Sequence, residues 1–178
     1  MDLRAVLLEL DEALREAGID HALIGGLALA AHGAGRATVD LDLLADGTRA
    51  DDVDRIVRSR GYDPLHRSEH AANYASSDAR RGRVDFLFAR RSYGRAMLAR
   101  AESRRVLGTS IRVVDAADLI GLKVQASSND PGRRLRDMAD VERLLETAAV
   151  DLERAREYFR LFDREKELDA LLARRGGS

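Results

Sequence analysis

Residues 23–44 read LIGGLALAAHGAGRATVDLDLL, and this stretch decides the fold. A short apolar strand over His21–Ile24 is interrupted by the glycine pair Gly25-Gly26. An alanine-rich helix is expected next, over Leu27–His32, and a second strand over Val39–Ala45. The order strand, glycine turn, helix, strand predicts a mixed α/β fold.

The second strand carries two acidic side chains. Successive side chains of a strand point to opposite faces, so we expect Val39, Leu41 and Leu43 to enter the core. Asp40 and Asp42 then lie side by side on the other face. Two neighbouring carboxylates repel each other unless a cation lies between them. Oxygen ligands of this kind suit Mg²⁺, which commonly binds one or two carboxylates together with substrate phosphates.

A third acid and the glycine pair fit the same chemistry. Asp85 lies in RVDFLF, residues 83–88, a strand that is otherwise mostly apolar and where an unpaired carboxylate is costly. If this strand neighbours the first acidic strand, three carboxylates converge on a site suited to two-metal phosphoryl transfer. Gly25 and Gly26 would let backbone N–H groups approach a phosphate at the start of the following helix.

Length and composition exclude several other classes of site. A chain of 178 residues without cysteine has no disulfide, thiolate zinc site or cysteine nucleophile. Its apolar runs are too short to span a bilayer, and acidic residues stand where a signal peptide is basic, so we expect a cytoplasmic protein without a membrane partner. The 30 basic and 31 acidic residues are unevenly spread, because residues 1–54 are acid-rich and residues 55–112 are rich in arginine. This asymmetry suggests an anionic substrate surface beside the metal ligands.

The remaining pattern predicts an α/β core followed by helices. The alternation of strands and helices continues to about residue 114, and from there the apolar spacing is helical. We therefore expect a core over residues 1–114, with a mixed sheet flanked by helices, and a helical part over residues 115–178 that packs on it. In the expected helix over residues 133–147, Leu135, Met138, Val141 and Leu145 form the apolar face. Arg133, Arg136, Asp137 and Asp140 share the opposite face.

The three motifs together resemble the nucleotidyltransferase superfamily, which has the DNA polymerase β-like fold. The stretches are residues 23–44, RVDFLF at residues 83–88, and ADLIGLKVQASSNDPGRRLRDMADVERLL at residues 117–145. The chain is most similar to small bacterial proteins grouped with the AbiEii-type toxins. The resemblance implies that Gly25 and Gly26 hold phosphates, and that Asp40, Asp42 and Asp85 form the catalytic site and bind the metal. It covers about residues 20–147 and departs from the common pattern at Leu27, where many members have serine.

The resemblance also implies further nucleotide-binding residues. Arg36 and Thr38 match an Arg-x-Thr that precedes the acid pair, and Arg36 would contact a phosphate. Lys123 is one of two lysines in a chain that otherwise uses arginine, and a flexible ammonium suits a triphosphate. Lys123 followed by a basic-x-x-acid-x-x-acid helix is a recurring element of this branch, which makes Arg133, Asp137 and Asp140 weaker candidates. A solvated helix face with internal ion pairs explains Arg133 equally well.

We interpret the sequence as that of a nucleotidyltransferase that uses two Mg²⁺ ions, with Mn²⁺ as an alternative. It would move a nucleoside monophosphate from an NTP such as ATP to a hydroxyl and release pyrophosphate. By resemblance alone, a toxin that modifies tRNA and pairs with an antitoxin ranks first. A transferase acting on an antibiotic-type small molecule or a protein ranks second, and a degenerate binding module with the same fold is the non-enzymatic alternative. A phosphatase or glycosyltransferase with an Asp-x-Asp motif leaves the glycine pair unexplained.

Overall fold

The computed structural model describes residues 1–176 and contains a seven-stranded mixed sheet. The strand order is β3-β4-β5-β2-β1-β7-β6, in which β2 pairs with β5 and β1 with β7 in parallel, and the other neighbours are antiparallel. The strands are β1 (His21–Leu23), β2 (Asp40–Asp46), β3 (Asp63–Arg67), β4 (Ala71–Ala75), β5 (Arg83–Ala89), β6 (Glu102–Val106) and β7 (Thr109–Val113). The predicted α/β class is confirmed.

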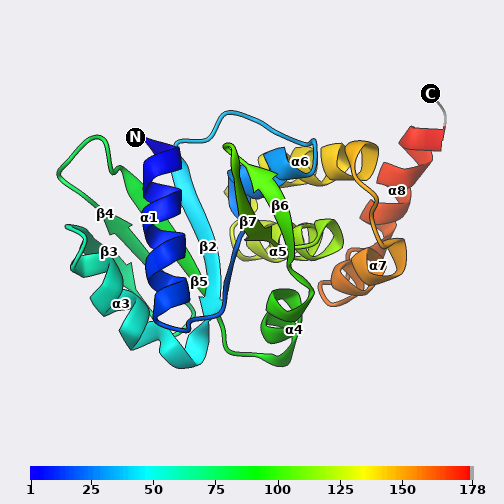
Figure 1. Cartoon of the computed structure of the whole chain (residues 1–178). Coiled ribbons are helices and arrows are strands. Elements are labelled where there is room, and N and C mark those ends of the chain that lie inside the picture. The colour runs from blue at the N-terminus through cyan, green and yellow to red at the C-terminus, as the bar shows by residue number, and fades with distance from the viewer. Residues whose placement is uncertain (177–178) are drawn as a thin grey trace.

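Helices flank this sheet on both sides (Figure 1). They are α1 (Leu3–Glu16), α2 (Gly25–Ala31), α3 (Ala50–Arg58), α4 (Ser92–Arg100), α5 (Ala116–Asn129), α6 (Arg134–Thr147), α7 (Leu152–Arg160) and α8 (Glu165–Gly176), with 3-10 turns η1 (Gly47–Arg49) and η2 (Pro131–Arg133). In Figure 1, α1 and α3 lie over the half of the sheet that contains β2 to β5, and α5 to α8 gather beside the other half. None of the helices in residues 1–176 combines the length and apolarity that a membrane span needs.

Local sequence explains where the first helix begins and which face it buries. The Asp2 carboxylate accepts a hydrogen bond of 3.0 Å from the Ala5 N–H and caps α1. Val6, Leu7, Leu10 and Leu14 recur at helical spacing and are buried against the sheet. Gly18, with φ of +66°, follows the end of the helix.

The acidic strand differs from its prediction at one end. It begins at Asp40, and Val39 precedes it with 73% of its surface exposed, so the expectation that Val39 enters the core is wrong. Leu41 and Leu43 are buried as expected, and Asp40 and Asp42 are half-buried on the other face. The alternation of faces holds only within the paired segment, because the pleat that produces it ends where the strand ends.

Candidate active site

The pairing of β2 with β5 brings two of the predicted acids together. Asp42 lies directly opposite Asp85 in the parallel register of these strands. Asp40 is two residues before Asp42 and therefore on the same face of β2. All three residues are half-buried. The structure thus places the three predicted metal ligands on one face of two adjacent strands.

The glycine pair packs against this acidic strand. Gly25 opens α2 with φ of +64°, and a Cβ there would lie 2.0 Å from Oδ2 of Asp42. A Cβ on Gly26 would lie 2.6 Å from the Cβ of Thr38. Real Cβ atoms do not approach other atoms so closely, so both positions require glycine for space, and Gly25 requires it for its backbone conformation as well. The first turn of α2 consequently lies directly on the Asp42 carboxylate.

The charged form of Asp42 is disfavoured when no cation is bound beside it. Burial, together with the charges of Asp85 and Asp40, raises the pKa of Asp42 to about 6. The Gly26 backbone N–H and the Lys123 charge act against these effects and lower the pKa. A site whose carboxylate is penalised by burial and by two like charges favours the binding of positive charge.

Asp85 also lacks a hydrogen-bond partner. Its Oδ1 is buried and accepts no hydrogen bond from any residue in the range 1–176, and Nη2 of Arg83 is 3.8 Å away. Within that range no three acidic or histidine side chains are already gathered closely enough to hold an ion. Unscreened carboxylates repel one another, so an open arrangement is the expected one without a cation. The oxygen donors and the unpartnered Oδ1 fit a hard divalent ion.

Lys123 forms ion pairs with two buried carboxylates. Its Nζ lies 3.1 Å from Oδ1 of Asp137 and 2.7 Å from Oδ2 of Asp140. Arg36 donates from Nε to Asp140 at 3.1 Å, and Nε of Arg133 is 3.3 Å from Oδ2 of Asp137. The predicted nucleotide-binding residues Arg36 and Lys123 and three of the weaker candidates therefore form one charged cluster, the Lys123 cluster (Arg36, Lys123, Arg133, Asp137 and Asp140). Direct contact of Lys123 or Arg36 with a nucleotide stays a prediction.

This cluster overturns the predicted faces of α6. Asp137 and Asp140 are fully buried together with Val141, Leu144 and Leu145, whereas Leu135 is 90% exposed. The aspartates thus occupy the inward stripe of the helix and do not lie opposite it. A buried carboxylate is tolerated only when it is paired, and Lys123 on α5 supplies the charge.

Leu27 does not face the site. Its side chain is buried in the hydrophobic core, with 7% of its surface exposed. The residue that departs from the common serine is therefore used for packing.

Ten of the 14 arginines of the arginine-rich segment form ion pairs within the described chain. Six of these arginines pair with acids from the acid-rich segment. The pairs are Arg55 with Asp52, Arg58 with Asp54, Arg60 with Glu9, Arg67 with Asp51, Arg81 with Glu9, and Arg112 with Asp20. The uneven charge along the sequence is therefore largely an internal complementarity. Only Arg83 of this segment pairs with one of the three candidate aspartates among the described residues.

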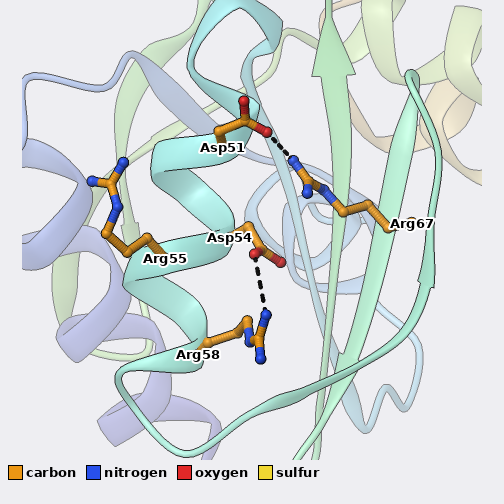
Figure 2. Close-up of a pocket in the computed structure, with 5 residues that line it drawn as sticks. All are labelled: Asp51, Asp54, Arg55, Arg58 and Arg67. Carbon is orange, nitrogen blue, oxygen red and sulfur yellow. Dashed lines mark hydrogen bonds and ion pairs between the residues drawn. The ribbon is translucent and has the colours of Figure 1, made fainter.

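Two open cavities lie away from the aspartates. One, of about 420 Å³, is lined by Asp51, Asp54, Arg55, Arg58 and Arg67 (Figure 2). Figure 2 shows Arg67 reaching from β3 to Asp51, and Arg58 reaching to Asp54, so charges in this cavity already have partners. The other, of about 240 Å³, lies between α1 and the segment around Arg80. Neither contains a predicted site residue.

Two residues near the aspartates were not predicted. Arg83 shares a strand face with Asp85, and the two-residue spacing in the sequence is a sufficient signal for it. Asn73 of β4 lies opposite Asp85 in the antiparallel register of β4 and β5. No local motif marks Asn73, because its position depends on how two strands pair.

A family model and several solved structures are similar to this chain. A family model described as uncharacterised nucleotidyltransferase matches residues 1–173. The solved antibiotic-resistance factor ANT(2'')-Ia is similar with a TM-score of 0.68 at 16% identity, over 100% of both chains. The lincosamide antibiotic adenylyltransferase LnuA is similar with a TM-score of 0.55 at 12% identity, over 81% of this chain and 97% of that one. A putative nucleotidyltransferase from Thermotoga maritima gives a TM-score of 0.55 at 15% identity, over 75% and 90%.

A sequence search of curated proteins finds no match. The solved structures establish the shared fold, and the family model extends over nearly the whole chain. The predicted enzyme class agrees with both, and the chain belongs to the family of uncharacterised nucleotidyltransferases.

Proposed function

We propose that the protein transfers a nucleoside monophosphate from an NTP to a hydroxyl of a small molecule and releases pyrophosphate. The proposal rests on one observation, the register that sets Asp42 opposite Asp85 with Asp40 on the same face. Three convergent carboxylates beside a tight glycine turn suit metal-assisted phosphoryl transfer. ATP is the nucleotide that we would test first, and the reaction would take place in the cytoplasm.

Asp40, Asp42 and Asp85 would hold one or two Mg²⁺ ions, with Mn²⁺ as a substitute. A divalent ion bound there supplies positive charge that stabilises the triphosphate and favours ionisation of the acceptor hydroxyl. Gly25 and Gly26 leave space for the triphosphate at the start of α2, because neither has a side chain. Arg36 and Lys123 add positive charge on the side of the site formed by α5 and α6.

Asp85 is the residue that we assign to proton removal. Its side chain is 25% exposed, and its Oδ1 makes no hydrogen bond in the described chain, so the carboxylate has unused capacity to accept the proton of a bound hydroxyl. The acceptor oxygen forms a bond to the α-phosphorus, and the bond from that phosphorus to the bridging oxygen of pyrophosphate breaks. The proton of the hydroxyl passes to Asp85, and pyrophosphate leaves with its charge.

The surface charges support a small-molecule acceptor. A tRNA acceptor requires unpaired basic residues that neutralise phosphates, yet ten of the 14 arginines of residues 55–112 are paired with acids. The fold of ANT(2'')-Ia, described as an antibiotic-resistance factor, matches this chain over its whole length. Both observations support a small molecule over tRNA, and they weigh against the toxin of a toxin–antitoxin pair.

A transfer assay tests the proposal. The protein is incubated with Mg²⁺ and each α-labelled NTP in the presence of tobramycin, lincomycin or total tRNA. Label is expected on a small molecule, and the Asp42→Asn variant should show none. Label on tRNA would show that the acceptor is tRNA and not a small molecule. Absence of transfer together with absence of Mg-NTP binding in calorimetry would refute the proposed enzymatic activity.

A further inference from the structure

We propose that Asn73 and His66 bind the acceptor, so that the acceptor lies across β4 and β3, on the face of the sheet opposite α3. The inference rests on the proposed function and adds the location and chemical class of the second substrate. The acceptor is a hydroxyl-bearing small molecule without phosphate groups.

The strand registers carry this inference. Asp42 is opposite Asp85, Asp85 is opposite Asn73, and Asn73 is opposite His66. Residues in register across neighbouring strands share a face, and each strand adds about 4.8 Å. The four residues therefore form a polar row across β2, β5, β4 and β3, with His66 about 10 Å from Asp85.

A bulge in β3 places the histidine in this row. Pro64 pairs with Tyr74, but the next pair along the strands joins His66 to Asn73 and skips Leu65. Without the irregularity, Leu65 would be the residue opposite Asn73. Bulges are frequent beside active sites because they re-aim a side chain.

The face that carries the row is the uncovered one. Tyr74 points to the opposite face, where its hydroxyl donates a 3.0 Å hydrogen bond to Asp54 of α3. Asn73 is half-buried, Leu87 is 37% exposed, and His66 is exposed. Ala71 and Ala75 flank Asn73 on the same face of β4 and leave room above it. A ligand can therefore approach Asp85 from this side.

Asn73 has the chemistry that a hydroxyl acceptor needs. Its side-chain amide makes no hydrogen bond to any residue in the range 1–176, and Oδ1 of the adjacent Asp85 makes none either. Cβ atoms of directly opposed residues are about 5 Å apart, so one hydroxyl can contact both side chains. The amide would orient the hydroxyl while Asp85 accepts its proton.

The charge beside the row favours an acceptor without phosphate groups. Asp40, Asp42 and Asp85 line one end of the row, and Arg83, the basic residue beside them, is already within 3.8 Å of Asp85. The charge of Mg²⁺ ions held there would be offset by the triphosphate of the bound NTP, so the occupied site favours a neutral or cationic molecule with several hydroxyl groups over a phosphodiester chain.

Side-chain amide signals provide a direct test, because the chain has two asparagines, Asn73 and Asn129, and one glutamine, Gln125. Uniformly ¹⁵N-labelled protein is saturated with Mg²⁺ and a non-hydrolysable ATP analogue, and then tobramycin, lincomycin or total tRNA is added. A small molecule should shift the Asn73 amide pair, identified by its loss in Asn73→Ala, while the pair of the exposed Asn129 stays unmoved. The inference is wrong if none of the probes shifts Asn73, or if tRNA alone does.

Kinetics separate this proposal from the proposed function. For an acceptor that is modified, Asn73→Ala should raise the acceptor KM about fivefold to tenfold, the usual effect of one lost hydrogen bond, and leave the NTP KM within about twofold. Asn129→Ala is the matched control and should change neither. Equal effects of Asn73→Ala on both constants would overturn the acceptor assignment, whereas failure of the wild type to bind Mg-NTP would overturn the proposed function itself.

Discussion

Position 25 requires glycine because the carboxylate of Asp42 lies against it. The backbone of α2 begins so close to β2 that a Cβ at this position would meet Oδ2 of Asp42 at 2.0 Å. The glycine pair of the sequence motif therefore has a packing role beside any contact with phosphate. The same approach brings the Gly26 N–H close enough to lower the pKa of Asp42, which couples the two halves of the motif.

Substitution of Gly25 tests this close contact against a matched glycine. Gly25 and Gly18 have nearly equal positive φ, +64° and +66°, but nothing lies within 4 Å of a Cβ on Gly18. Gly18→Ala should cost only the backbone strain, about 1 to 2 kcal/mol of unfolding free energy. Gly25→Ala should cost more and abolish transfer, because Asp42 must move. Equal losses in urea denaturation, with activity retained, would contradict the contact.

Removal of the Asp42 charge should stabilise the metal-free protein. Burial, Asp85 and Asp40 raise the pKa of this carboxyl to about 6, so its charged form is penalised in the folded state at pH 7. Asp42→Asn should raise the unfolding free energy in EDTA by as much as about 3 kcal/mol and eliminate transfer. Asp46→Asn, at the other end of the strand, should not stabilise, because Asp46 accepts hydrogen bonds from Thr48.

His32 should make the fold sensitive to mild acid. Burial lowers the pKa of its imidazole from the ordinary 6.5, and its Nε2 lies 2.9 Å from the Val114 carbonyl. The unfolded chain gains this proton first, so stability is complete above pH 6.5 and falls as the pH drops from there towards the lowered pKa. Urea denaturation between pH 7.5 and pH 5 should show a smaller loss for His32→Asn. Identical pH profiles would argue against the buried neutral imidazole.

At the scale of elements, one glycine sets how closely α7 packs on α5. A Cβ on Gly121 would lie 2.6 Å from the ring of Tyr158. An alanine inside a helix ordinarily stabilises by about 1 kcal/mol relative to glycine. Gly121→Ala should instead destabilise by about 1 to 3 kcal/mol, since the ring cannot move away without losing the hydrogen bond from its hydroxyl to Asp118.

A double-mutant cycle isolates that contact. In a Tyr158→Ala background the ring is absent, so Gly121→Ala should become nearly neutral or stabilising in urea denaturation. A penalty that persists without the ring would show that the alanine is excluded for another reason.

Local sequence signals predict where helices and strands lie, but they predict less well which side chains of an element point into the core. The strand predicted at residues 83–88 and the helical pattern predicted after residue 114 are confirmed by β5 and by α5 to α8, because those patterns are local. Val39 was misplaced because a strand's end is fixed by its partner β5, which begins at Arg83 opposite Asp40. The inward direction of Asp137 and Asp140 depends on Lys123 from another helix. Tertiary pairing of this kind leaves no periodic signal.

At the scale of the whole molecule, long-range contacts join the two predicted regions. Arg36 in the α2–β2 loop donates to Asp140 of α6, and the Thr147 hydroxyl donates to the His32 carbonyl at 3.2 Å. We propose that residues 115–178 brace the loop that leads into the acidic strand. Asp40, Asp42 and Asp85 were predictable because each lies in a short motif, whereas Asn73 depends on register and Lys123's partners depend on helix packing.

The pairing of the acid-rich and arginine-rich segments changes what the charge pattern means. Residues that are distant in sequence, such as Arg112 and Asp20 or Arg81 and Glu9, neutralise each other in the fold. Each exposed pair contributes little stability, about 0 to 1 kcal/mol, so its main effect is on the surface field. The arginine-rich segment suggests binding of a polyanion, but the folded protein has a surface of mixed charge.

This mixed surface predicts weak binding of RNA. In 150 mM NaCl, a mobility-shift assay with total tRNA should give only non-specific affinity, with Kd of about 10⁻⁴ to 10⁻⁶ M. The Asp51→Asn/Asp54→Asn variant frees Arg67 and Arg58 from their partners and should bind tRNA more tightly, with a steeper dependence on salt. Arg91→Gln, at an exposed arginine of the same segment, is the control and should not strengthen binding. Tight wild-type binding that resists salt would instead support a tRNA acceptor, because paired arginines cannot supply it.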